Sequence, residues 1–307
     1  MRRRSSILIK GTTALTSVVL LASCAGCEAK VYGSPGDKSA APRLTMVAPQ
    51  APADATPEAA VSQPTVALDS LDLRIGQATA EAAKKGADVS VLVLDRETGQ
   101  QVFNGGATNL ATASVAKLFI ADDLLLRQPN LSPADRKSLD VMLRSSDDSA
   151  AEVFWYAGGG SAILDRVATR YGLTSLGHPN DGRWWNTVIS PQDLARYYDM
   201  LLDGSGGLPP ERANIIVNNL AQSTPTGIDG YPQRFGIPDG LYDEPVAVKQ
   251  GWMCCIGADW MHLSTGVIGA SRRYVMVVYS LQPTDDATAR ATITQAVKTI
   301  FPGGRIS

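Results

Sequence analysis

The chain has 307 residues, of which 44% are apolar, 19% charged and 6% aromatic, and its formal net charge is −2. This composition is typical of a globular protein with a sizeable core and excludes a disordered or fibrous chain. The absence of a basic surplus gives no indication of a nucleic-acid partner. With two histidines and no HExxH, GxSxG, GxxxxGK[ST] or GxGxxG motif, the sequence also gives no sign of a metal or a cofactor.

The N-terminus has the features of an export signal. Residues 1–23 contain four basic residues and a short apolar stretch at residues 14–22, too short for a transmembrane helix. The stretch ends at Cys24 in a context that resembles a bacterial lipobox, in which the cysteine carries the lipid. We therefore expect a protein anchored by lipid on Cys24 at the extracytoplasmic face of the cell membrane. Ordinary secretion and a retained anchor remain as alternatives.

A linker is predicted to follow the lipidated cysteine. Residues 24–66 are rich in alanine and proline and have no apolar periodicity. Cys24 and Cys27 form a CxxC, but no second ligand pair accompanies it, so it indicates neither zinc nor redox chemistry. Residues 67–307 are then expected to form one domain.

The order of the predicted elements indicates the fold class. Apolar periodicity and turn residues predict a helix at 67–86, a hairpin at 88–94 and 101–103, a helical segment at 114–220, strands at 246–249, 262–268 and 274–280, and a helix at 284–301. The N- and C-terminal parts would share one sheet. We therefore predict an α+β fold, a five-stranded antiparallel sheet flanked by helices, with a helical lobe beside it and a cleft between them.

The first motif that could perform chemistry is SxxK, formed by Ser114 and Lys117 at the start of an apolar helical run. Residues three apart lie on one helix face. A desolvated lysine can be neutral and can accept the proton of a neighbouring hydroxyl. The alternative is a helix-capping serine and an unrelated lysine, because SxxK is short enough to occur by chance.

Two further motifs follow along the chain. Ser146-Asp-Asp lies between two helical stretches, where it could supply a second hydroxyl or simply cap the next helix. Lys249-Gln-Gly ends an apolar run, where glycine would allow a ligand backbone to approach, and an ordinary lysine at a strand end is the alternative.

Taken together in this order, the three motifs resemble the SxxK, SDN and KTG pattern of the penicillin-recognising serine enzymes. The chain is most similar to a class A β-lactamase-like domain over about residues 67–307. The resemblance implies that Ser114 is the acylated nucleophile, that Lys117 accepts its proton, and that Ser146 protonates the leaving nitrogen.

The same resemblance implies a substrate site and an oxyanion hole. The residues at the substrate-binding positions are Asp148, Lys249, Gln250, Gly251 and Trp252. Lys249 would hold the Ser146 hydroxyl and attract a substrate carboxylate, and the backbone N–H groups of Ser114 and Trp252 would bind the oxyanion. A β-lactam or a peptidoglycan-like peptide would be the ligand.

The sequence departs from the family pattern at several positions. The family's deacylating glutamate has no counterpart, because no glutamate lies between Glu152 and Glu211. Asp181, the only carboxylate in the loop at 178–187, is interpreted as a turn former. Asp148 occupies the position of the asparagine in SDN, and Gln250 occupies the position of the threonine in KTG. We therefore expect a long-lived acyl-enzyme and weak or absent β-lactamase turnover.

Two hypotheses follow for the function of the domain. One is a slow serine acyltransferase or hydrolase acting on an amide or ester, and the other is a catalytically degenerate binding or scaffold module of the cell envelope. Trp184, Trp185 and Trp252 are interpreted as core or cleft walls, and Cys254 with Cys255 as either a vicinal disulfide or two free thiols. In either case we expect a monomer. A solvent-reachable Ser114 beside Lys117 would favour the enzyme.

Overall fold

The computed structural model describes residues 68–306, so the predicted signal segment, Cys24 and the linker lie outside the described residues. The sheet and its covering helices come from both ends of the described chain: α1 (Leu68–Ala83), β1 (Asp88–Asp95), β2 (Gln101–Asn104), α8 (Ile237–Gly240), β5 (Val246–Ile256), β6 (Asp259–Ile268), β7 (Tyr274–Gln282) and α9 (Asp286–Ile300). Among residues 68–306, no helix is both long and apolar enough to cross a membrane.

The middle of the described chain forms a helical lobe. Its elements are β3 (Leu110–Ala111), the 3₁₀ helix η1 (Ala113–Ala116), α2 (Lys117–Arg127), α3 (Pro133–Arg144), α4 (Asp148–Ala157), α5 (Ala162–Tyr171), the 3₁₀ helix η2 (Trp184–Asn186), β4 (Val188–Ile189), α6 (Pro191–Asp203) and α7 (Pro210–Ala221). The predicted helical segment therefore begins with a tighter 3₁₀ turn, and the SxxK motif spans the junction between η1 and α2.

The main sheet has the predicted five strands and is antiparallel throughout, in the order β2-β1-β7-β6-β5. The fold-class prediction is thus confirmed. The prediction for β5 was too short, since the strand continues past Lys249-Gln-Gly to Ile256. β5 is an edge strand that packs against η1, which places the third motif beside the first.

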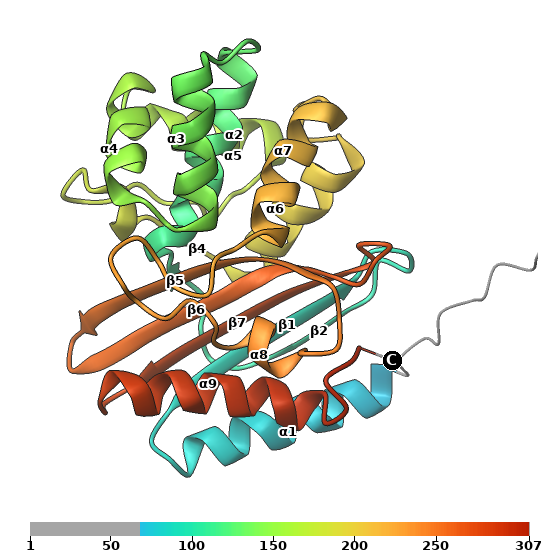
Figure 1. Cartoon of the computed structure of the whole chain (residues 1–307). Coiled ribbons are helices and arrows are strands. Elements are labelled where there is room, and N and C mark those ends of the chain that lie inside the picture. Colours follow the sequence, from blue (N-terminus) through green and yellow to red (C-terminus); the bar gives the residue numbers. More distant parts are fainter. Residues whose placement is uncertain (1–67, 307) are drawn as a thin grey trace, which may run out of the picture. The chain divides into compact units, whose positions relative to one another are not determined.

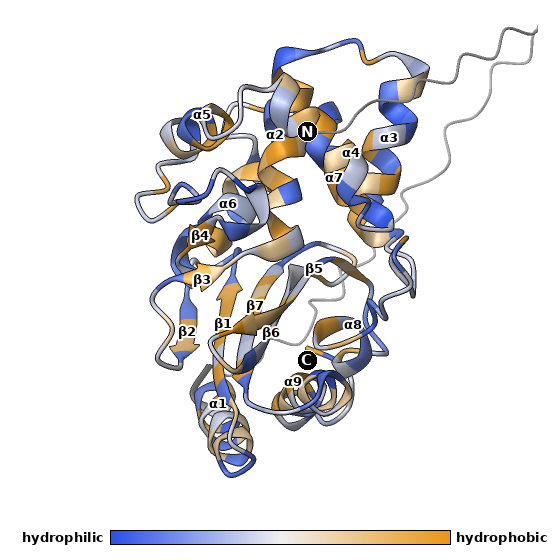
Figure 2. Ribbon diagram, turned by 90° about the vertical axis from the view of Figure 1, so that its left-hand side faces the viewer, coloured by the Kyte–Doolittle hydropathy of each residue, from blue (hydrophilic) through white to orange (hydrophobic). Residues whose placement is uncertain are grey.

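Helices cover both faces of this sheet (Figure 1). One hydrophobic core lies between the sheet and α1, α8 and α9, and a second lies between the sheet and the helical lobe. β1 is almost entirely buried between the two layers, and Figure 2 shows it as largely hydrophobic. A central strand buried on both faces has no polar face, which is why its sequence alternates only weakly.

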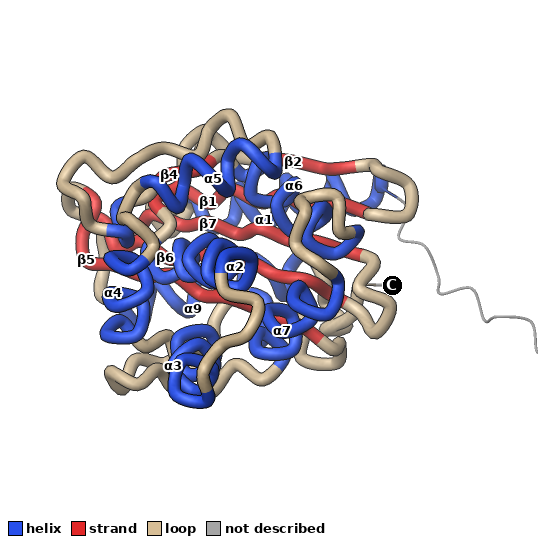
Figure 3. The backbone as a smooth tube through the Cα atoms, turned by 90° about the horizontal axis from the view of Figure 1, so that it is seen from above, coloured by secondary structure: helices blue, strands red, loops and turns tan. Residues whose placement is uncertain are grey.

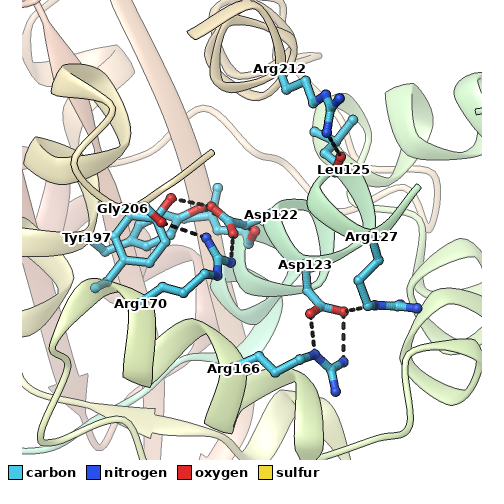
Figure 4. A network of polar contacts seen from close by, with 11 residues as sticks. Asp122, Asp123, Leu125, Arg127, Arg166, Arg170, Tyr197, Gly206 and Arg212 are labelled. Carbon is cyan, nitrogen blue, oxygen red and sulfur yellow. Dashed lines mark hydrogen bonds and ion pairs between the residues drawn. The ribbon is translucent and has the colours of Figure 1, made fainter. Parts of the chain in front are cut away.

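α2 lies at the centre of the helical lobe, with α3, α4, α5 and α7 packed around it (Figure 3). Two carboxylates in this helix, Asp122 and Asp123, are fully buried and are neutralised by arginines (Figure 4). Asp123 accepts two hydrogen bonds from Arg166, at 2.6 and 2.9 Å, and one from Arg127 at 2.6 Å. Asp122 pairs with Arg170. These buried pairs fix the helix that begins at Lys117.

Side-chain caps set the starts of several helices, as the sequence predicts for Ser/Asp residues that precede them. Ser190 accepts a hydrogen bond from the backbone N–H of Asp193, and Pro191 occupies the first position of α6. Asp147 caps α4 in the same way, through the N–H of Ala150. The second motif therefore does cap a helix, and the cap at Asp147 fixes the positions of Ser146 and Asp148 on either side of it.

Candidate active site

Ser114 lies on the wall of a cavity of about 220 Å³ between the helical lobe and β5. The cavity is lined by Ala113, Ser114, Asp148, Trp184, Trp185, Asp229, Trp252 and Met253. Ser114 itself is 8% exposed, so its hydroxyl is largely buried but reachable from the cavity. The tryptophans form walls, as interpreted from the sequence, and do not seal the site.

Lys117 joins the first motif to the second. Its Nζ is 2.7 Å from Ser114 Oγ, 2.8 Å from the backbone carbonyl oxygen of Ser146 and 3.1 Å from Ser146 Oγ. The same nitrogen donates to Asp148 Oδ1 at 2.6 Å. Burial lowers the pKa of Lys117 below its ordinary value, and the carboxylate of Asp148 opposes that effect.

Lys249 joins the third motif to the second. Its Nζ donates to Ser146 Oγ at 2.9 Å and to the carbonyl oxygen of Gln250 at 3.2 Å. The side chain is 1% exposed, and burial together with the nearby Lys117 holds its pKa well below the ordinary value. Ser146 Oγ is therefore in hydrogen-bond contact with two buried amines, an arrangement through which a proton can be passed.

The backbone at the site adopts uncommon conformations. Among residues 68–306, three non-glycine residues have φ in the left-handed region, and two of them are Ala113 (φ 42°), which precedes Ser114, and Ser146 (φ 58°). Such conformations cost about 1–3 kcal/mol each and concentrate at functional sites. They set the directions of the two hydroxyls that meet Lys117.

The remaining positions of the third motif serve different purposes. A Cβ atom at Gly251 would lie 2.5 Å from the carbonyl oxygen of Thr112, so glycine lets β5 approach the backbone that leads to Ser114. The buried side chain of Gln250 points away from the cavity, and its Nε2 donates to the carbonyl oxygens of Gln233 and Phe235 at 2.9 and 2.6 Å. Gln250 is thus not among the residues that line the cavity.

Comparison with known proteins relates this arrangement to a family. The family described as "Beta-lactamase enzyme family" matches residues 128–302, which is more than half of the chain. The chain belongs to this family. Over its full length, it is 60% identical to the full-length proteins named "Putative lipoprotein LppW" of Mycobacterium bovis and Mycobacterium tuberculosis. The family match begins after Ser114 and Lys117, so the interpretation of those two residues depends on the geometry described above.

Solved structures of two β-lactamases and of PBP-A share the fold. A β-lactamase from Chitinophaga pinensis has a TM-score of 0.60 and 14% identity, with 76% of this chain and 100% of that chain covered. The TLA-3 extended-spectrum β-lactamase has a TM-score of 0.62 and 14% identity, with 77% and 98% covered. PBP-A has a TM-score of 0.60 and 18% identity, with 78% and 97% covered. At these identities the likeness supports the fold alone.

The indole of Trp184, from the loop at 178–187, covers one side of Lys117. The ring of Trp184 lies 4.8 Å from Lys117 Nζ, and its Nε1 donates to Glu152 Oε2 at 3.0 Å. The carboxylate of the same loop, Asp181, is exposed and accepts hydrogen bonds from Arg183 N and Asn186 Nδ2, which is the turn-forming role interpreted from the sequence.

The short β3–β4 pair, which the sequence did not predict, holds this loop against the nucleophile. Thr112 donates its N–H and its hydroxyl to the carbonyl oxygen of Thr187, each at 2.9 Å, and Thr187 Oγ1 donates to Trp184 O at 2.7 Å. The position of Trp184 is therefore coupled through hydrogen bonds to the segment that carries Ser114.

Sequence reasoning did not identify the loop that forms the opposite wall. Asp229 lines the cavity, and Tyr231 stacks on Trp252 with 4.4 Å between ring centroids and 5° between planes. Behind them, Tyr231 Oη meets Asp286 and lies 2.7 Å from Nε2 of the fully buried His262. An Asp-Gly-Tyr turn is common in loops, so the sequence offered little signal for these residues.

Cys254 and Cys255 form the vicinal disulfide that the sequence left open, joined by a cis peptide bond at the exposed end of β5. They follow Met253, the last lining residue of the cavity. Within residues 68–306, no group of three or more histidine, cysteine, aspartate or glutamate side chains is arranged to hold a metal ion.

Proposed function

We propose that the protein is a slow serine acyltransferase or hydrolase that acts on an amide or ester and turns over β-lactams weakly or not at all. The observation that supports this most is the 2.7 Å contact between Ser114 Oγ, reachable from the cavity, and Nζ of Lys117, a buried amine whose pKa is lowered. A neutral amine in that position can act as a general base.

The acylation step follows from these contacts. Ser114 Oγ attacks the carbonyl carbon while its proton passes to neutral Lys117, and the backbone N–H groups of Ser114 and Trp252 bind the oxygen that becomes negative. The tetrahedral adduct then collapses, the bond to the leaving nitrogen or oxygen breaks, and Ser146 gives that atom a proton. Lys117 reprotonates Ser146 across 3.1 Å, so the products are an acyl-serine and a neutral leaving group.

Hydrolysis of the acyl-serine needs a water molecule activated by a base. Trp184, not a carboxylate, faces Lys117 from the loop that provides this base in the family. The acyl-enzyme therefore persists, and its hydrolysis is the slow step of any turnover.

The place of action that we propose is the outer face of the cell membrane. The 60% identical relatives bear a lipoprotein name, and Cys24 of this chain ends a segment with the features of a lipoprotein signal. A lipid on Cys24 would hold the domain close to cell-wall peptides. Peptide amides of the wall and β-lactams are accordingly the substrate candidates, with the protein acting as a monomer.

Intact-mass spectrometry of the purified protein tests this proposal. The protein is incubated with a penicillin and, separately, with an uncharged p-nitrophenyl ester. We expect a stable mass increase of one acyl group from at least one of the two donors in the wild type and in Ser149→Ala, and none from either donor in Ser114→Ala. Ser149 is a matched control because it is an exposed serine in α4, next to the second motif.

A binding or scaffold module is the second candidate function, and the ion pair between Lys117 and Asp148 favours it. That pair stabilises the charged form of Lys117, which cannot accept a proton from Ser114. If no acyl donor labels the folded wild type, the enzyme proposal is wrong and the binding module is the better interpretation.

A further inference from the structure

The accessible surface of the cavity beside Ser114 is acidic. Its lining includes Asp148 and Asp229, and the side chain of Asp148 is 73% exposed. Asp229 is also exposed, in the loop that precedes β5. Among the described residues that line this cavity, there is no lysine and no arginine.

The two lysines of the site do not offset this charge at the surface. Lys117 and Lys249 are 0% and 1% exposed, and both lie behind the serine hydroxyls. Lys117 is already paired with Asp148, and Lys249 donates to Ser146 and to a backbone carbonyl oxygen. A ligand carboxylate would therefore meet no lysine or arginine in the lining, but would face Asp229 and the exposed part of the Asp148 carboxylate, whose Oδ1 is paired with Lys117.

The other walls are aromatic and favour the same kind of ligand. Trp184, Trp185 and Trp252 line the cavity, and the face of an indole attracts a cation within about 6 Å of its centre. Two of these rings already take part in such contacts: Lys117 Nζ lies 4.8 Å from the ring centroid of Trp184, and the guanidinium of Arg183 lies 5.6 Å from that of Trp185. Arg183 is outside the lining and pairs with Asp181 at 3.7 Å.

We propose that the substrate of this site bears a cationic group, such as an ammonium, close to the amide or ester that Ser114 attacks. The inference rests on the proposed function, because it names the substrate class of the same site. It rests on three observations together: a reachable nucleophile, two carboxylates at the cavity surface and aromatic walls. The carboxylate-bearing substrate implied by the family resemblance lacks an exposed partner in this cavity.

Isothermal titration calorimetry tests the charge preference directly, with three unactivated anilides whose cleavage is slow on the time scale of the titration. The three acyl groups are 4-(trimethylammonio)butyryl, its uncharged tert-butyl isostere 5,5-dimethylhexanoyl, and glutaryl, which carries a carboxylate. At low ionic strength we expect the cation to bind about tenfold more tightly than the isostere, and the anion to bind most weakly. The preference should shrink at about 0.5 M salt, where the screening length is a few ångströms.

Asp229→Asn isolates the contribution of one carboxylate. Asp229 Oδ1 accepts the backbone N–H of Tyr231 at 3.0 Å, and asparagine keeps that acceptor while removing the charge. Asp203→Asn is the matched control, because Asp203 accepts the N–H of Ser205 at 2.7 Å in the same way, away from the cavity. We expect Asp229→Asn to reduce the preference for the cation about three- to tenfold and Asp203→Asn to leave it unchanged.

The p-nitrophenyl esters of the same three acyl groups separate this inference from the proposed function. If the cationic anilide binds best but no ester acylates Ser114, the acyl-transfer function is wrong and the charge preference stands. If the esters acylate Ser114 but the isostere binds as tightly as the cation, or Asp229→Asn behaves like Asp203→Asn, the charge inference is wrong.

Discussion

Asp148→Asn should make the protein a faster acyl-transfer enzyme at neutral pH. Asp148 accepts a hydrogen bond from Lys117 Nζ at 2.6 Å and raises the pKa of that lysine against the lowering effect of burial. Asparagine keeps an acceptor oxygen but carries no charge. The pKa of Lys117 should therefore fall, and the fraction of the neutral amine that can accept the proton of Ser114 should rise.

The size of the effect follows from the exposure of the carboxylate. A hydrogen bond to a charged group contributes about 1.5–3 kcal/mol, but the Asp148 side chain is 73% exposed and water weakens the pair. For the contribution of this pair to the charged form of Lys117 we take about 1 kcal/mol, the upper end of the range for exposed ion pairs. Since 1.36 kcal/mol corresponds to one pKa unit, the pKa of Lys117 should fall by about one. Acylation by an uncharged ester should then be up to about tenfold faster at pH values at which Lys117 of the wild type is still mostly protonated.

Release of p-nitrophenolate in the first turnover, measured between about pH 6 and 10, reports this directly. The rise of the acylation rate with pH should begin at lower pH in Asp148→Asn than in the wild type. Asp285→Asn is the control, because asparagine preserves the cap of α9 and Asp285 is not among the carboxylates that raise the pKa of Lys117. An unmoved pH profile, or slower acylation at pH 7, would refute the assignment of Lys117 as the base.

Three further predictions address the proton donor, the buried histidine and the buried ion pairs. Ser146→Ala should slow acylation by a p-nitroanilide about a hundredfold or more. Acylation by a p-nitrophenyl ester should slow less than about tenfold, because p-nitrophenolate leaves without a proton. Equal losses of rate for the two substrates in stopped-flow assays would contradict the assignment of Ser146 as the proton donor. His262 is buried and its pKa is lowered to about 4. Because its unfolded pKa is about 6.5, the free energy of unfolding should fall by up to about 3 kcal/mol as the pH decreases from 6.5 to 4. Urea titrations should show that His262→Gln lacks this component while the exposed His178→Gln keeps it. Asp123→Ala should cost about 2–4 kcal/mol, because it leaves two arginines unpaired, and a melting temperature within 2 °C of the wild type would argue against that cost.

The fold could be predicted from the sequence because its signals are local. The elements of the main sheet follow apolar periodicity and turn residues, and the order of strands and helices leaves few ways to bury them. The end of β5 was missed because Trp252, Met253 and the two cysteines follow a glycine, which usually marks the end of a strand. The β3–β4 pair has two residues in each strand, too few for any periodicity to appear.

The candidate site, like the fold, could be predicted from the sequence only in part. Ser114, Lys117, Ser146 and Lys249 could be selected because each belongs to a short motif, and the structure brings their side chains together. Their catalytic roles stay predictions. The acidic wall could not be foreseen, because Asp229 reaches the cavity only through the path of a long loop, and a lone aspartate before glycine is indistinguishable from an ordinary turn residue.

The close approach at Gly251 has a consequence for how this site can change over evolutionary time. Any side chain there would collide with the carbonyl oxygen of Thr112 and push the sheet away from the nucleophile, so position 251 tolerates no replacement while the two lobes stay packed. The side chain of the neighbouring Gln250 donates hydrogen bonds to the backbone carbonyl oxygens of Gln233 and Phe235, away from the nucleophile. A lineage can therefore alter the middle of the third motif without disturbing the packing around the serine, and a departure from a family pattern at that position is weak evidence that a site has decayed.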